Sequence, residues 1–341
     1  MHDVRPHGAI ACFGELLLRY GAPGRELLLQ SPRLEVHVGG AEANVAVGLA
    51  SLGHAPRMIS RVPDDPLGRS ALHHLRAHGV DTQRVAIAPG RMGIYYLAQG
   101  AGLRSSEILY DRAFSSFAGA TAAGYDWEAL LDGVGLLHLS GITPALGSEP
   151  AAVALAAVAA AKSLGILVSF DGNYRAQLWA RWDGSPRAIL TGIVAQADIL
   201  FGNHRDISLL LNKDFGGAGP RRRREAAEAM FAAFPGLKII ASTARRVEDS
   251  DRHRISARLD TPSGAIQTDE IALSGIVDRL GTGDAFAAGI LHGLCKGLDP
   301  EATVRAGHAL ACLKHSLPGD ASLFGEADIA AFSDQSFDIR R

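Results

Sequence analysis

The chain has 341 residues, of which 47% are hydrophobic and 21% charged, and its formal net charge is −2. This length allows one large α/β domain or two ordinary ones, and a core of full size can be buried. The near-neutral charge gives no electrostatic footprint for nucleic acid or another polyanion.

Cysteine usage and apolar stretches bear on the compartment. Cys12, Cys295 and Cys312 are scattered without zinc-ligand or C-x-x-C spacing, which is typical of reduced thiols in a cytosol. Residues 1–6 lack the apolar run of a signal peptide. The most apolar stretch, residues 150–162, is rich in alanine and too short to span a bilayer. We therefore expect a cytoplasmic protein without a membrane partner.

Strand and helix patterns alternate along most of the chain. Residues 9–18 form a near-continuous apolar run, typical of a strand buried on both faces. Helical patterns over 42–52 and 67–78 end at Gly53 and Gly79. Further strands are predicted at 57–61, 136–139, 164–170, 199–201 and 237–241, and further helices at 150–162, 185–196 and 224–234. Such alternation predicts a parallel sheet with helices on both faces, which binds ligands beyond the carboxyl ends of its strands.

Two segments break this alternation. Residues 27–38 alternate apolar and polar side chains, and residues 93–112 read as two short strands around the turn at 100–102. Period-2 patterning predicts antiparallel strands with one solvated face. We therefore expect a single domain over 1–341 with a small β-lid, formed by about 19–38 and 93–112. Residues 216–224, a glycine-rich stretch followed by four arginines, read as a flexible surface loop before an exposed helix start.

The segment 278–289 is the most informative one. Gly281 and Gly283 flank Thr282, Asp284 follows, and an apolar helix then runs to about residue 294. Glycines allow a tight turn with outward N–H groups, and the helix N-terminus adds its positive dipole end, so the segment predicts an anion hole for a transferring phosphate. Asp284 is placed to accept a proton from an attacking hydroxyl. The alternative is that Asp284 only caps the helix.

Two motifs carry a resemblance to a known family. G-T-G-D-A-F at 281–286 resembles the second signature of the ribokinase (PfkB) family of carbohydrate kinases, and G-G-A-E-A-N-V-A at 39–46 resembles the first. They stand in the family's order, and the resemblance extends over 14–320. It implies a ribokinase-like three-layer α/β/α domain with a mostly parallel sheet and a β-sheet lid. It also implies ATP and Mg²⁺ as cofactors and a homo-oligomer, dimer or higher.

Three shorter motifs are similar to those of the 2-keto-3-deoxygluconate kinases within this family. They are Y-D-R at 110–112, D-G-N-Y-R at 171–175 and P-G-D at 318–320. The resemblance implies phosphorylation of 2-keto-3-deoxygluconate to 2-keto-3-deoxy-6-phosphogluconate. Arg112 and Arg175 would supply forked donors for the substrate carboxylate, although either arginine alone could form a structural ion pair.

Further sugar contacts follow from the same resemblance. Tyr95 and Tyr110 would offer flat faces with a polar tip, unless they only pack between strands. Backbone approach or hydrogen bonds to sugar hydroxyls are implied for Gly39, Gly40, Asn44 and Asp320.

The metal site departs from the family pattern. Where the family has N-x-x-E, this chain has Asn203 and, three residues later, the shorter Asp206. Mg²⁺ keeps several waters, so an indirect contact through water is still expected of Asp206. Asn203 is expected near the nucleotide, and it can cap a helix at the same time. Asp278 lies where some relatives hold K⁺, which makes K⁺ a further candidate cofactor, although this acid could instead lie behind the ion's direct ligands.

The nucleotide segment departs as well. Residues 241–246 lack the glycines that most members have in a loop there. Thr243 and Arg245 remain candidates for phosphate contacts. His308 occupies the place where the family lines the adenine or ribose pocket, although a lone helical histidine is more often a packing residue.

Three rival functions remain at this stage. A kinase of the same family for a neutral sugar such as fructose is disfavoured by Arg112 and Arg175. A catalytically weak sensor of a sugar acid or nucleotide is suggested by Asp206 and the glycine-poor segment, and disfavoured by the intact anion-hole motif. A dinucleotide oxidoreductase would need an early glycine fingerprint, which the sequence lacks.

Overall fold

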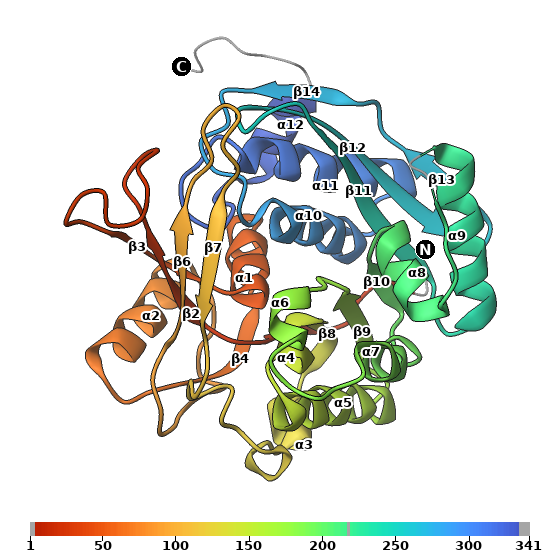
Figure 1. Cartoon of the computed structure of the whole chain (residues 1–341). Coiled ribbons are helices and arrows are strands. Elements are labelled where there is room, and N and C mark those ends of the chain that lie inside the picture. Colours follow the sequence, from red (N-terminus) through yellow and green to blue (C-terminus); the bar gives the residue numbers. More distant parts are fainter. Residues whose placement is uncertain (1–3, 217–218, 334–341) are drawn as a thin grey trace.

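The computed structural model describes residues 4–216 and 219–333, and its centre is a large twisted sheet (Figure 1). Within these ranges the strands follow the order β13-β12-β11-β10-β9-β8-β1-β4-β5, and β14 also pairs with β12. The strands from β11 to β5 run parallel, whereas β12 is antiparallel to its neighbours. The bounds are β1 (Ala9–Phe13), β4 (Arg57–Val62), β5 (Val85–Ile87), β8 (Val134–Ser140), β9 (Leu167–Asp171), β10 (Ile199–Phe201), β11 (Ile239–Val247), β12 (Arg252–Thr261), β13 (Gly264–Gln267) and β14 (Ile271–Ser274).

The central strands are buried on both faces, as their apolar runs predict. In β1, Ala11 and Phe13 belong to one core cluster, while Ile10 and Cys12 belong to the other. Successive side chains of a strand point to opposite faces, so one strand feeds both cores. This confirms the predicted parallel sheet.

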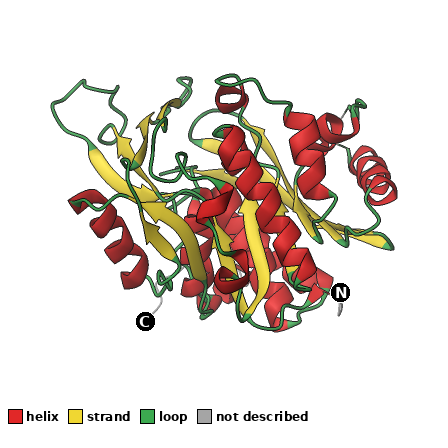
Figure 2. Ribbon diagram, turned by 90° about the horizontal axis from the view of Figure 1, so that it is seen from below, coloured by secondary structure: helices red, strands yellow, loops and turns green. Residues whose placement is uncertain are grey.

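Helices cover both faces and complete a three-layer α/β/α architecture (Figure 2). One core cluster includes residues of α1 (Ala41–Ser51), α2 (Pro66–Ala77), α10 (Thr282–Lys296) and α11 (Pro300–Lys314), and α12 (Glu326–Ser333) packs on α11. The other includes residues of α3 (Trp127–Leu130), α4 (Ile142–Ala145), α5 (Ser148–Ser163), α6 (Ala176–Trp179), α7 (Pro186–Val194), α8 (His204–Leu211) and α9 (Pro220–Ala233). None of the helices in the described ranges has the length and apolarity needed to cross a membrane.

A separate small sheet forms the lid. Its order is β3 (Glu35–Gly39), β2 (Leu17–Gly21), β6 (Gly93–Ala98), β7 (Glu107–Asp111). The outer pairs are antiparallel as expected, but β2 and β6 run parallel.

Several sequence-based boundaries need correction. The strand expected over 9–18 is two strands in two sheets, since β1 ends at Phe13 and β2 begins at Leu17. Gly14 lies between them, and a side chain there would collide with the Glu42 carboxylate. Residues 27–34 form turns and bends rather than a strand. The segment 241–246 is no loop: β11 continues through it to Val247, paired with β12. The strands β12 to β14 were not predicted at all.

The arginine-rich segment is also more structured than expected. Helix α9 begins at Pro220, so the four arginines lie within it, and Arg224 pairs with Glu228 and Asp260. Of the predicted loop before it, residues 217–218 lie outside the described ranges, as do residues 1–3 of the N-terminal segment.

Candidate active site

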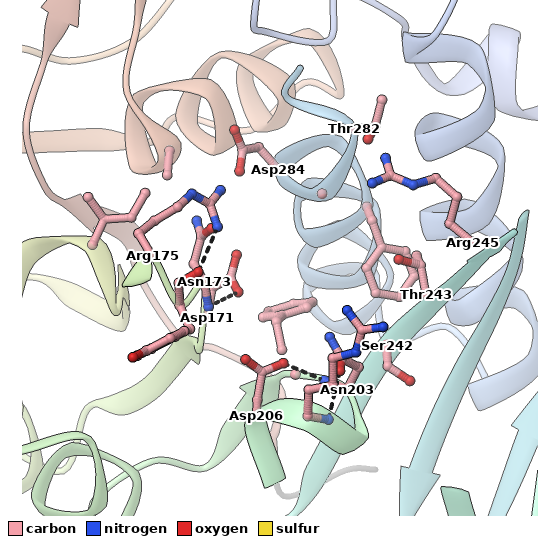
Figure 3. A pocket seen from close by; sticks show the side chains of 18 of the residues that line it. Asp171, Asn173, Arg175, Asn203, Asp206, Ser242, Thr243, Arg245, Thr282 and Asp284 are labelled. Atoms are coloured by element: carbon pink, nitrogen blue, oxygen red, sulfur yellow. Dashed lines mark hydrogen bonds between the residues drawn. The ribbon is translucent and has the colours of Figure 1, made fainter. Parts of the chain in front are cut away.

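A cavity of about 1250 Å³ opens beyond the carboxyl ends of β9 and β10, between the large sheet, the lid and the start of α10 (Figure 3). This is the edge at which parallel α/β sheets bind ligands. Most of the residues predicted from the sequence line it: Gly40, Asn44, Tyr95, Tyr110, Arg112, Arg175, Asn203, Asp206, Thr243, Arg245, Gly281, Thr282, Gly283, Asp284 and Asp320.

The glycine turn at the head of α10 builds an anion-binding helix end. Gly281 is the N-cap residue with φ +72°, and a Cβ there would lie 1.6 Å from the Asp320 carbonyl oxygen. Gly283 faces open space, and within the described part of the chain no side chain caps this helix. The first N–H groups of α10 are therefore left for a ligand. Asp284 is the third residue of the helix, which excludes its role as N-cap.

Asp284 has the properties of a general base. Its side chain is buried in the pocket wall, and its Oδ2 accepts a hydrogen bond from Asn44 Nδ2 at 2.7 Å. Burial raises the pKa of Asp284 to about 7, with a further rise from Glu42, while the Asn44 hydrogen bond opposes the shift. A carboxyl that titrates near neutral pH can both take up and release a proton under working conditions.

Two more carboxyls line the cavity, Asp171 at the end of β9 and Asp206 in the first turn of α8. Burial raises the pKa of Asp171, and the neighbouring charges of Asp284 and Asp206 raise it further. Burial also raises the pKa of Asp206, whose Oδ2 accepts from the Asn203 amide at 2.8 Å. A carboxyl whose pKa is raised by neighbouring carboxylates, as that of Asp171 is, would be stabilised in its charged form by a bound cation. Among the described residues no three His, Cys, Asp or Glu side chains are grouped to hold a metal ion by themselves. Mg²⁺ usually keeps several waters and binds through one or two carboxylates plus substrate phosphates, and Asp206 fits that kind of contact.

Asn203 and Asp206 also form a capping box at the start of α8. The Asn203 side chain accepts from the Arg205 amide at 2.8 Å, and Asp206 reciprocates on the Asn203 amide. The capping role that the sequence allowed for Asn203 is thus present.

The two predicted carboxylate-binding arginines differ in their partners. Arg112 is buried, and its Nε and Nη2 both lie 2.5 Å from Glu15 Oε2. Arg175 is half-buried on the pocket wall, donates to the Tyr174 carbonyl at 3.2 Å, and has no carboxylate within 4 Å among the described residues. Arg175 is therefore the cation with capacity for an anionic ligand, whereas Arg112 is already neutralised.

The lid tyrosines Tyr95 and Tyr110 line the part of the cavity next to the small sheet. The rings of Tyr95 and Tyr110 lie 6.4 Å apart, and Tyr95 donates to Asp320 Oδ2 at 2.5 Å. Asp320 Oδ1 accepts from Arg19 at 2.7 Å, so both of its oxygens already have donors within the protein.

The part of the cavity next to β11 is cationic, since Arg245 and Arg279 both line it. Thr243 and Arg245 lie on β11, and burial lowers the pKa of Arg245, as does the neighbouring Arg279. Two guanidinium groups that line one cavity, one of which lowers the pKa of the other, would be stabilised by an anion such as a phosphate. Arg279 was not predicted, although it stands inside the glycine motif.

Two predicted site residues do not line the cavity. His308 is buried against β12, where its ring bonds the Ile255 carbonyl at 3.0 Å, so it packs as a core residue. Gly39 ends β3, where a Cβ would lie 2.5 Å from Asp320 Oδ2, so the glycine serves close packing with that carboxylate.

Sequence reasoning missed Glu15, the partner of Arg112. Its only signal in the sequence was its position, a carboxylate just after a buried strand.

Comparison with known proteins agrees with this geometry. The pfkB family carbohydrate kinase pattern matches residues 8–245 and 256–324. The chain is 31% identical over 313 residues to the 2-dehydro-3-deoxygalactonokinase of Haloferax volcanii, covering 91% of this chain and 92% of that one. It is 27% identical to the 2-dehydro-3-deoxygluconokinase of Bacillus subtilis, over 90% of each chain. The crystal structure of the Thermotoga maritima 2-dehydro-3-deoxygluconokinase superposes with a TM-score of 0.91 at 33% identity, covering 96% of this chain and 100% of that one. The chain belongs to the pfkB family of carbohydrate kinases.

Proposed function

We propose that this sugar kinase phosphorylates the terminal hydroxyl of a keto-deoxy sugar acid, with 2-keto-3-deoxygluconate as the first candidate, at the expense of ATP. The observation that carries the proposal is Arg175, a half-buried guanidinium in the sugar end of the cavity without a carboxylate partner among the described residues. A substrate carboxylate would supply a direct ion pair, which Asp171, Asp206 and Asp284 do not form although their charges act on Arg175 from a longer distance. The relatives compared above are named for two such acids, the gluconate and the galactonate forms.

The reaction follows from the residues around Asp284. The substrate hydroxyl lies between Asp284 and the start of α10, and Asp284 takes its proton as the oxygen attacks the γ-phosphorus of ATP in line. The N–H groups at Thr282 and Gly283 stabilise the negative charge on the transferring group. Mg²⁺, when bound near Asp206 through water, would neutralise phosphate charge.

A neutral-sugar kinase is the principal alternative within the family. Because Arg112 is paired with Glu15, Arg175 is the remaining electrostatic argument against a neutral-sugar substrate. Beside a neutral sugar, Arg175 would form no direct ion pair with a described carboxylate, and only the more distant charges of Asp171, Asp206 and Asp284 would balance it. Whether Arg175 contacts a substrate carboxylate therefore decides between the sugar-acid class and the neutral-sugar class.

The test is the ratio of kcat/KM for a sugar acid to that for a neutral sugar, in the wild type and in Arg175→Ala. Loss of a charge-assisted hydrogen bond costs about 1.5–3 kcal/mol, or roughly ten- to a hundredfold in kcat/KM. We expect the wild type to prefer 2-keto-3-deoxygluconate or its galactonate epimer over fructose and ribose by at least that factor, and Arg175→Ala to remove most of the preference.

The matched control is Arg187→Ala, which removes an exposed arginine of α7 and should leave the ratio unchanged. If the wild type favours fructose, or if Arg175→Ala slows both substrate classes equally, the sugar-acid proposal is wrong and only the kinase assignment stands.

A further inference from the structure

A group of buried charges lies directly beneath the anion-hole turn. Arg19 is 2% exposed, Asp278 3%, Asp320 5% and Lys314 0%. Arg19 Nη1 lies 2.7 Å from both Asp278 Oδ2 and Asp320 Oδ1, and Lys314 Nζ donates to the Leu317 carbonyl at 3.0 Å. Two cations thus balance two carboxylates in a place without solvent.

Asp278 is the residue at which a K⁺ ion is expected from the family resemblance, and its surroundings do not fit one. Its Oδ1 accepts from the Leu280 amide at 3.0 Å, and its Oδ2 accepts from the Gly319 amide at 3.2 Å and from Arg19. A monovalent cation would need to compete with these donors for the carboxylate.

Lys314 occupies the chemical role that such an ion would have. Its ammonium group binds a backbone carbonyl of the turn that leads to Asp320. Burial lowers the pKa of Lys314, and the carboxylates of Asp278 and Asp320 oppose that shift. A third positive charge beside Arg19 and Lys314 would be buried without an anion of its own, which is costly.

We propose that Lys314, with Arg19, is a built-in replacement for the monovalent cation, so that the kinase needs no K⁺. Lys314 acts as a positioning residue. It balances the charge of the Asp278 and Asp320 carboxylates. The backbone carbonyl of Asp320 lies against Gly281, the first residue of the anion-hole turn. The inference rests on membership of the kinase family and is independent of which sugar is phosphorylated.

The first test compares the wild type in potassium, sodium and tetramethylammonium chloride at equal ionic strength. An ion that binds the native state raises Tm with its concentration. We expect coincident Tm values and similar kcat in all three salts. A K⁺-specific rise in Tm, or K⁺ activation of kcat by about tenfold or more, would overturn the proposal.

The second test uses Lys314→Met, which keeps the length of the side chain and removes its charge. Because Asp278 and Asp320 then share one cation, we expect a lower Tm and a lower kcat, both partly restored by K⁺ and not by tetramethylammonium. Lys213→Met removes an exposed lysine and should change neither quantity in any salt. A folded Lys314→Met protein that responds equally to all three salts would contradict the proposal. If Lys314→Met does not fold, the wild-type salt comparison alone decides.

Discussion

At the scale of single residues, the proposal that Asp284 is the general base predicts the pH range in which the kinase works. A general base acts only when it is deprotonated, and the pKa of Asp284 is raised to about 7. We therefore expect kcat/KM to rise with pH and to level off above a midpoint near 7. A pH profile of the purified enzyme measures this. A midpoint near that of an ordinary carboxyl, about 4, would show that burial does not act on the base as argued.

Asn44 provides a directed change of that midpoint. Its amide donates to Asp284 and stabilises the ionised form, so Asn44→Ala should move the midpoint to higher pH.

Asp284→Asn should keep the fold and lose kcat by roughly a hundred- to ten-thousandfold. Near-normal turnover in Asp284→Asn would remove Asp284 from the role of base.

Asp206 combines a structural and a metal-related role, and two variants separate them. Asp206→Ala removes the capping box of α8 and the carboxylate near the expected phosphates. Asp206→Glu keeps a carboxylate that can complete the capping box. We expect the Mg²⁺ concentration for half-maximal rate to rise roughly ten- to a hundredfold in Asp206→Ala, with a smaller change in sugar KM. Asp206→Glu should retain the wild-type requirement. If the wild type and both variants need the same Mg²⁺ concentration for half-maximal rate, Asp206 only caps helix α8 and has no role in metal binding.

At the scale of elements, the turn before α10 separates folding from phosphate binding. A Cβ at Gly281 would meet the Asp320 carbonyl at a positive φ, so Gly281→Ala should lower Tm. A Cβ at Gly283 meets nothing, and alanine favours helices, so Gly283→Ala should keep or raise Tm. Yet its methyl group would enter the expected phosphate position, and we expect kcat to fall on the order of a hundredfold. Unchanged kcat in a stable Gly283→Ala protein would place the phosphate elsewhere.

Sequence patterns predicted those elements whose signal is local. The buried runs of β8, β9 and β10 and the glycine turn at Gly281 are fixed by neighbouring residues, and they were found. The split between β1 and β2 was missed, because the apolar run continues across it, and the packing of Glu42 beside Gly14, 28 residues earlier, is not visible in the local pattern. Strand β12 was missed although His253, Ile255, Ala257 and Leu259 alternate along it with more polar residues.

The same distinction holds for the site. Residues that line the cavity and belong to a sequence motif, such as Asp284 and Arg175, could be found from the local sequence. Partners brought together by the fold could not: Glu15 neutralises Arg112 from 97 positions away, and Arg19 reaches Asp320 from 301 positions away. The assignment of His308 to the nucleotide pocket failed for this reason, because β12, which covers that histidine, was itself not predicted.

At the scale of the whole molecule, the lid is joined to the large domain through Asp320. Arg19 comes from β2 and Tyr95 from β6, and both donate to the carboxylate that follows α11. Three segments distant in sequence thereby meet at the sugar end of the cavity. A lid held in this way presents Tyr95 and Tyr110 to a substrate in a fixed orientation, which lowers the ordering cost of binding.

Tyr95→Phe tests this connection. The variant keeps the ring against the pocket but leaves Asp320 Oδ2 without its donor, and an unsatisfied buried acceptor costs about 1–3 kcal/mol. We expect Tm to fall by at least about 2–4 °C, the shift that roughly 1 kcal/mol produces in a large domain, together with a higher sugar KM and little change in ATP KM. Tyr96→Phe is the matched control, because Tyr96 is the next residue of β6, points to the opposite face and packs against Tyr20. If both variants lower Tm equally, or if Tyr95→Phe raises the ATP KM as much as the sugar KM, Asp320 does not hold the lid over the sugar end as argued.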